Sequence, residues 1–440
     1  MTPISAVARA AARLLEQEAR ALLTRLAQVK PFALQETMVA AAAPASATQA
    51  VIDRQLLAGR AQIRRLVVEF IAWLNSPAGR STPPFRSQQK FTLLRLRFNA
   101  ALTQLDIFAD ALTQRSESDT GVWLAGLDVV AADALRLNGN YYIAPPVICY
   151  LDRGHGAAIR RARTRLPGGG ENPVAVIRVP RERMIGSGIA SSLIHEVGHQ
   201  AAALLDLVES VRPLLKGLQA NGGPERVAWQ YWERCLSEIV ADFWAVARLG
   251  ITATQGLLAV VSLPGYFVFR LSLDDPHPVP WLRLKLSCAM GRALYPHPQW
   301  DSLERIWEEL YPPREIPQER RGLFQLLQRT MPGLAALLAH HRPPKLRGAS
   351  LAEALRVNER APAKLSAAWQ TWLQHRAELR RAPPSLAFAV IGQARAEGLI
   401  TPEAESRLLT KLLRYWALRG ALDTSAAYAN QQPDEAIPLF

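Results

Sequence analysis

Strand-forming sequence is confined to two short segments in the middle of this 440-residue chain. The segments are YYIAPPVICYLD, residues 141–152, and NPVAVIRVPRER, residues 172–183. Both are rich in β-branched and aromatic residues and are bounded by proline and glycine. Elsewhere apolar residues recur every three or four positions, which predicts helices. The chain is therefore predicted to be a predominantly helical α+β protein with one small sheet.

Turn-forming stretches divide the chain into three predicted domains, residues 1–118, 119–315 and 316–440. The first is predicted to be a helical bundle, with a third helix at about 90–113 and a linker at 114–121. The second holds both strands. The third is helical again, with its helices separated by proline pairs or glycine.

The segment between the two strands, RGHGAAIRRARTRLPGGG, is predicted to be a long mobile loop. The second strand leads directly into the next predicted helix. Because of that position, we predict that the second strand pairs with an extended peptide by strand addition.

The balance of charge limits the expected partners. Lys and Arg number 52 against 38 Asp and Glu, which gives a formal net charge of +14 and favours an acidic partner surface. The basic residues are scattered, and no nucleic-acid-binding motif accompanies them, so a specific nucleic-acid partner is not predicted.

The compartment is predicted from what the sequence lacks. Three widely spaced cysteines fit neither a disulfide framework nor a CxxC metal site, which favours a reducing environment. The longest uncharged run, residues 251–269, contains Thr, Gln, Ser and a Pro-Gly pair, so it is predicted to be a buried helix and turn. We therefore expect a cytoplasmic protein without membrane contact, and export without a signal peptide stays open.

The stretch SSLIHEVGHQ, residues 191–200, contains two histidines four positions apart. In a helix this spacing puts His195 and His199 on one face. Two neutral imidazoles that converge on one ion are what a zinc site requires. Three polar residues that share a helix by chance are the alternative, so a third ligand decides.

The following predicted helix, residues 224–250, supplies a candidate. Glu238 and Asp242 lie four residues apart in its densest apolar stretch, CLSEIVADFWAVA. A buried unpaired carboxylate is costly, and a dication and a histidine would relieve that cost. We predict Glu238 as the third zinc ligand and Asp242 as the carboxylate that orients a ligating imidazole. An acidic stripe on a surface helix is the alternative. Asp206 lies seven residues, or roughly 10 Å, beyond His199 and is not predicted to reach a shared ion.

HExxH followed on the next helix by ExxxD resembles the gluzincin group of zinc metallopeptidases, to which thermolysin belongs. A third element, DDPHPVPWLRLK at residues 274–285, is similar to the region after the glutamate helix in CaaX-prenyl-protease-like and related bacterial gluzincins. The resemblance covers roughly residues 140–300. The transmembrane helices of the prenyl-protease branch are missing from this sequence.

The resemblance implies a role for each matching residue. By position, the zinc ligands would be His195, His199 and Glu238, the general base Glu196, and the side chains near the substrate oxygen His277 and Arg283. Two alternatives stay open from the residues alone. In the first, His277 is a residue of a proline-rich turn without a catalytic role. In the second, Arg283 is a structural ion-pair partner of Asp274 or Asp275.

We therefore expect a zinc-dependent peptidase that acts on a protein or peptide substrate, with a gluzincin-like core flanked by helical regions. Zinc held by three protein ligands keeps a position for water, and Glu196 accepts the water proton. The rival is a helical interaction or scaffold protein whose metallopeptidase-like domain binds a partner without cutting it. A nucleic-acid-binding role driven by the positive charge comes third.

Overall fold

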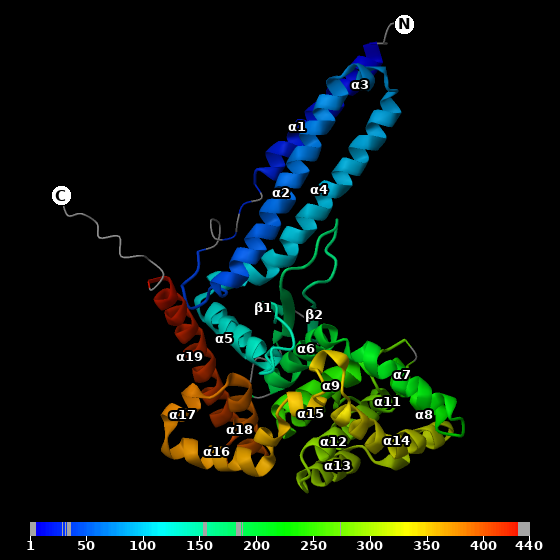
Figure 1. The fold of residues 1–440 in the computed structure, drawn as a ribbon, viewed down its shortest axis with the longest axis vertical. Helices are drawn as coiled ribbons and strands as arrows, with labels where there is room; N and C mark the ends of the chain where they lie inside the picture. Colours follow the sequence, from blue (N-terminus) through cyan, green and yellow to red (C-terminus); the bar gives the residue numbers. More distant parts are fainter. Residues whose placement is uncertain are drawn as a thin grey trace, which may run out of the picture.

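The computed structural model shows a body of packed helices from which a long helical bundle projects (Figure 1). The structure describes residues 6–28, 30, 32, 37–152, 156–181, 186, 188–272 and 274–429. Helices predominate, and the described residues form one small sheet. The prediction of a mainly helical α+β chain is thus confirmed.

The N-terminal helices form the projection. They are α1 (Ala6–Leu26), α2 (Ser46–Asn75), α3 (Pro77–Ser81) and α4 (Pro84–Leu112). The long helices α1, α2 and α4 pack around shared apolar residues such as Leu22, Val67 and Phe91, with α3 at the outer end (Figure 1). The third long helix begins earlier than predicted, because Pro84 is favourable in a first helical turn.

The predicted linker at 114–121 is wrong. A 3-10 helix, Thr113–Ser116, continues from α4, and α5 (Ser118–Leu135) begins two residues later. Within this polar stretch Arg115 is fully buried and donates a hydrogen bond of 3.1 Å to Asp128. The segment is polar in sequence, like a solvent-exposed linker. The bond between the buried Arg115 and Asp128 nevertheless fixes it to the core.

The sheet has three strands in the order β1-β3-β2. β1 (Val147–Asp152) and β3 (Ala175–Pro180) are parallel, and β2 (Ala158–Arg160) is antiparallel to β3. β2 lies in the segment predicted to be a mobile loop, so that prediction is wrong for these three residues; residues 153–155 of the segment lie outside the described part. Because β1 and β2 occupy both edges of β3, the prediction that β3 pairs with a peptide is also wrong.

The two faces of the sheet pack against different helices. Strand side chains alternate between faces. Cys149 and Ile177 therefore point into the main core, where α6 (Gly188–Leu205) covers the sheet. Ile148 and Val176 point to the other face and pack with Phe108 of α4. The base of the projecting bundle is thus anchored on the sheet.

The body contains the remaining helices. They are α7 (Leu207–Ala220), α8 (Arg226–Arg234), α9 (Leu236–Leu249), α10 (Ile251–Val261), α11 (Gly265–Val268), α12 (Pro280–Leu294), α13 (Gln299–Leu310), α14 (Arg321–His340), α15 (Leu351–Ala354), α16 (Pro362–Gln374), α17 (Arg376–Arg381), α18 (Pro384–Ala396) and α19 (Pro402–Ala429). Figure 1 shows α19 beside α5, which packs against it.

One hydrophobic cluster extends from Trp123 to Trp416. Residues on both sides of position 315 therefore share a core. Arg360 strengthens this connection, because its Nη1 donates a 2.6 Å hydrogen bond to the carbonyl of Arg248 on α9. The three domain limits taken from the sequence stay predictions.

The uncharged run at 251–269 forms α10, which is mostly buried as predicted, and then a turn and the short helix α11. Leu263, Tyr266 and Phe267 of this second part are exposed, so the prediction that the turn is buried is wrong. Among the described residues, none of the helices combines the length and the apolar character needed to cross a membrane.

Candidate metal centre

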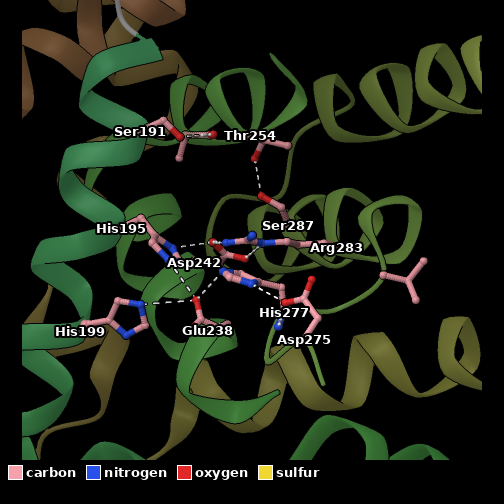
Figure 2. A network of polar contacts seen from close by, with 12 residues as sticks. Ser191, His195, His199, Glu238, Asp242, Thr254, Asp275, His277, Arg283 and Ser287 are labelled. Carbon is pink, nitrogen blue, oxygen red and sulfur yellow. Dashed lines mark hydrogen bonds and ion pairs between the residues drawn. The ribbon is translucent and has the colours of Figure 1, made fainter. Parts of the chain in front are cut away.

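Two histidines project from one face of α6, the helix that follows β3 (Figure 2). The ring centroids of His195 and His199 are 4.9 Å apart. Their Nε2 atoms lie 3.2 and 3.4 Å from Oε2 of Glu238. The helix thus presents both imidazoles to the same carboxylate oxygen.

Glu238 comes from α9, which lies against α6. The sequence predicted one helix from residue 224 to 250, but the structure interrupts it at Cys235, between α8 and α9. Glu238 is therefore in the first turn of a separate helix and is buried. One donor atom each from His195, His199 and Glu238 lie within 4.8 Å of one another.

The close approach of α6 and α9 depends on Gly198, inside the HEVGH motif. A Cβ atom at this position would lie 2.8 Å from Cα and 2.9 Å from the carbonyl oxygen of Ala241. Such distances are too short for non-bonded atoms, and backbone cannot move aside as a flexible side chain can. Glycine therefore allows α9 to bring Glu238 within reach of the histidines.

Gly198→Ala is expected to destabilise the protein by about 1–3 kcal/mol, because the added methyl group overpacks the helix contact. It is also expected to weaken any metal binding by His195, His199 and Glu238, since α9 must move away. Thermal unfolding of the metal-free protein and elemental analysis measure the two effects. Gly217→Ala is the matched control, because a Cβ there meets nothing within 4 Å. Equal stability of the two variants would contradict this account.

Asp242 lies one turn after Glu238 and is also buried. Its Oδ1 is 2.8 Å from Nδ1 of His195. Arg283 of α12 donates from Nε to Oδ2 at 2.7 Å and from Nη2 to Oδ1 at 2.8 Å. Asp242 thereby faces the nitrogen of the His195 ring that points away from Glu238.

The partner of Arg283 differs from both sequence alternatives for an ion pair. Asp274 and Asp275 were the candidates, and neither pairs with it among the described residues. The bidentate pair with Asp242 fixes the guanidinium instead. Arg283 also lines the cavity that His195 and His277 line.

His277 lies on the turn before α12. Its Nε2 is 3.1 Å from Oε2 of Glu238, and its Nδ1 is 2.7 Å from Oδ1 of Asp275. The backbone N–H of His277 donates to the same Asp275 oxygen at 2.9 Å. The aspartate therefore fixes the ring in an orientation that points Nε2 toward Glu238. The side chain is 41% exposed, which leaves it accessible from the cavity.

Glu196 is only 6% exposed and lines the same cavity as His195, His277 and Arg283. Burial raises the pKa of the Glu196 carboxyl, against the opposing influence of His195 and His199. A carboxylate with a raised pKa is a stronger base than one in water. Its burial and position fit a group that accepts a proton.

Without a metal ion, the neighbouring carboxylates favour the protonated, positively charged form of His195. Burial of His195 disfavours its charged form, but Asp242 and Glu238 outweigh this and raise the pKa of His195 to about 9. Burial would raise the pKa of Glu238, yet His195, His199 and His277 hold it well below its usual range. A metal ion bound here would replace the protons that these pairs hold.

A cavity of about 300 Å³ opens beside the histidines and Glu196. Its far side is apolar and comes from α9, α10 and the turn that follows α10. The apolar side chains of that wall include Val246, Leu257, Val260, Val261 and Leu263. Polar side chains, among them His195 and Glu196, and an apolar recess therefore share one cavity.

Sequence reasoning missed three parts of this centre. Gly198 carried a usable signal, since a glycine inside a helix often marks close packing. Asp275 also did, because an aspartate in a turn commonly accepts from the backbone two residues on. The contribution of α10 to the cavity wall had no local signal, since nothing in that apolar run indicates which helix it packs beside.

Comparisons with protein-family models, curated proteins and solved structures found no match for this chain. The chemistry is therefore argued from the arrangement of the side chains.

Proposed function

We propose that this chain is a zinc metallopeptidase of the gluzincin type, which hydrolyses peptide bonds in a protein or peptide substrate. One observation carries the proposal. Donor atoms of His195, His199 and Glu238 lie within 4.8 Å of one another, and His195 and the buried Glu196 line one cavity. Ligands and base thus come from one turn of α6 and one turn of α9.

The donor set fits zinc. Oε2 of Glu238 is buried and lies within 3.4 Å of three imidazole nitrogens, but no hydrogen bond of acceptable angle satisfies it. Such an orphaned buried oxygen is costly unless a cation or donor meets it. Two imidazoles and one carboxylate form a common ligand set of catalytic zinc. When bound there, zinc would lower the pKa of a water molecule and polarise a carbonyl group.

Glu196 is the proposed general base. From its place beside the ligand histidines, its carboxylate accepts the proton of the attacking water and passes it to the nitrogen of the leaving amine. The raised pKa of its carboxyl suits both transfers, because the group must take up and release the same proton. Its burial also keeps bulk water away from that proton.

His277 is the proposed donor to the oxyanion. Asp275 lies 2.7 Å from Nδ1, and Nε2, 3.1 Å from Oε2 of Glu238, is the nitrogen beside the proposed ligands, where the reacting carbonyl would bind. Preorganised donors of this kind stabilise the charge that develops in the transition state. Arg283 acts through Asp242 on the orientation of His195 and is therefore proposed as a positioning residue.

His277→Ala is expected to lower kcat about 10²- to 10³-fold with a small change in KM, because an oxyanion donor acts mainly in the transition state. Zinc content is expected to be unchanged. Steady-state kinetics and elemental analysis measure these quantities. If kcat is retained and only the unfolding temperature falls, His277 belongs to the turn and not to the reaction.

The cavity and the sheet suggest how a peptide binds. β2 is the outer strand, and the loop residues just before it, Gly156 and Ala157, line the cavity. An extended peptide that pairs with β2 would pass the zinc ligands and place one apolar side chain in the recess formed by α10.

The experiment that tests the function is cleavage of a proteome-derived peptide library by the zinc-loaded protein, with Glu196→Gln as the inactive control. Metal-dependent cleavage that the control lacks is the expected result. If the zinc-loaded protein cuts nothing, the scaffold alternative replaces the peptidase.

A further inference from the structure

A second concave surface, the arginine groove, lies on the face of the sheet that α4 covers. Its charged lining consists of Arg160, Arg161, Arg165 and Arg178, with Asp110 of α4 as the only acidic residue among the lining side chains. The first three arginines are exposed, and Arg178 is half-buried. The groove therefore combines strong positive charge with access from solvent.

Most of this charge is unneutralised. Arg178 pairs with Asp152 at 3.2 Å. Within the described residues, Arg160, Arg161 and Arg165 form no ion pair. Three exposed guanidinium groups in one groove repel one another, and an anionic ligand would relieve that repulsion. Their planar donor sets also match carboxylates in a bidentate manner.

β2 connects the groove to the candidate metal centre. Ala157, directly before the strand, lines the cavity beside Glu196, and Ala158 and Arg160 of the strand line the groove. In the part of the chain that the structure describes, β2 pairs with β3 alone. Its outer edge is thus available along the path between the two sites.

The register shows which side chains of a bound peptide would reach the arginines. Ala158 is opposite Arg178, and Arg160 is opposite Val176, so these side chains share the α4 face of the sheet. A peptide added to β2 would send every second side chain to that face. Arg160 lies three residues beyond Ala157, or about 10 Å along an extended chain.

We propose that the arginine groove binds an acidic segment of the peptide substrate, about three residues from the bond that is cleaved. This rests on the proposed peptidase function and adds a substrate class to it. A nucleic acid would also meet the positive charge. The edge strand favours a peptide, because strand addition recognises peptide backbone and leads from the groove to the cavity.

The test uses matched peptides that differ only at the third position from the cleaved bond, with Glu, Gln or Lys there. The wild type is expected to cleave the Glu peptide with about 10-fold higher kcat/KM than the Gln peptide, mainly through KM. In the double variant Arg160→Glu/Arg165→Glu the order is expected to reverse in favour of Lys. Arg329→Glu, an exposed charge reversal on α14 outside the groove, is expected to keep the wild-type order.

A binding measurement separates this proposal from the peptidase function. The Glu196→Gln variant, with and without the double substitution, is titrated into labelled Glu, Gln and Lys peptides and a single-stranded RNA. Preference for the Glu peptide that the double substitution reverses supports the groove even if the wild type cuts nothing. Equal cleavage and binding of all three peptides overturns it. Tighter binding of RNA that the double substitution abolishes assigns the groove to nucleic acid.

Discussion

Glu196→Gln is expected to lower kcat/KM for peptide hydrolysis about 10²- to 10⁴-fold, the contribution of a general base. Glutamine has almost the same shape but cannot accept the water proton. Glu196 is 6% exposed and lines the cavity together with His195 and His277. Asp242 and Asp275 also line the cavity, but each is held in an ion pair, with Arg283 and His277 respectively. Kinetics on a peptide identified from the library measure the loss.

The same variant is expected to keep its zinc and its stability. Because burial raises the pKa of the Glu196 carboxyl, its charged form opposes folding above the unfolded pKa, and this cost is present at neutral pH. Neutral glutamine removes that cost, so the unfolding temperature is expected to be equal or higher. A variant with near-wild-type turnover would remove Glu196 from the mechanism. Loss of zinc would show that the substitution acts through the metal site.

The fold class could be predicted because the helical and strand periods are local properties of the sequence. The strands at 147–152 and 175–180 formed within the two segments that carried the strand pattern. β2 could not be predicted from the same evidence. It has three residues, and its pairing with β3 depends on a contact that its own composition does not encode. Arg115 caused the wrong prediction of a linker, because nothing in the local sequence distinguishes a buried arginine from an exposed one.

The centre shows the same limit at the level of single residues. Spacing alone placed His195 and His199 on one helix face, and the buried acidic pair indicated Glu238 and Asp242. The spacing did not predict that the helix is interrupted at Cys235. This interruption makes α9 a separate helix with Glu238 in its first turn. The pairing of Arg283 with Asp242 also depends on how α12 packs against α9, which is a tertiary contact.

Removal of the proposed zinc ligands is expected to give a graded loss of metal. Wild-type protein purified without added metal is expected to hold about one zinc per chain by elemental analysis. His195→Ala, His199→Ala and Glu238→Ala each remove one of the three converging donors and are expected to lose most of it. Zinc retention by both histidine variants would place the metal elsewhere.

A second variant tests Asp242, the carboxylate that faces His195 without being one of the three proposed ligands. Asp242→Asn keeps the shape of the side chain but loses the charge that faces Nδ1 of His195 and the guanidinium of Arg283. Because the substitution leaves all three ligands in place, zinc affinity is expected to fall about 10- to 100-fold without being abolished. Competition with a chelator of known affinity measures this difference.

Asp206→Ala is the matched control, because it removes an acidic residue that is close to the ligands in sequence. In the structure α6 ends at Leu205, and Asp206 has a left-handed backbone with φ of 52°. Its carboxylate lies 2.7 Å from Nζ of Lys345 in a half-exposed pair, whose loss costs little stability. Asp206→Ala is therefore expected to bind zinc as the wild type does. If it emptied the site while Glu238→Ala left the site full, the ligand set and the gluzincin assignment would both be wrong.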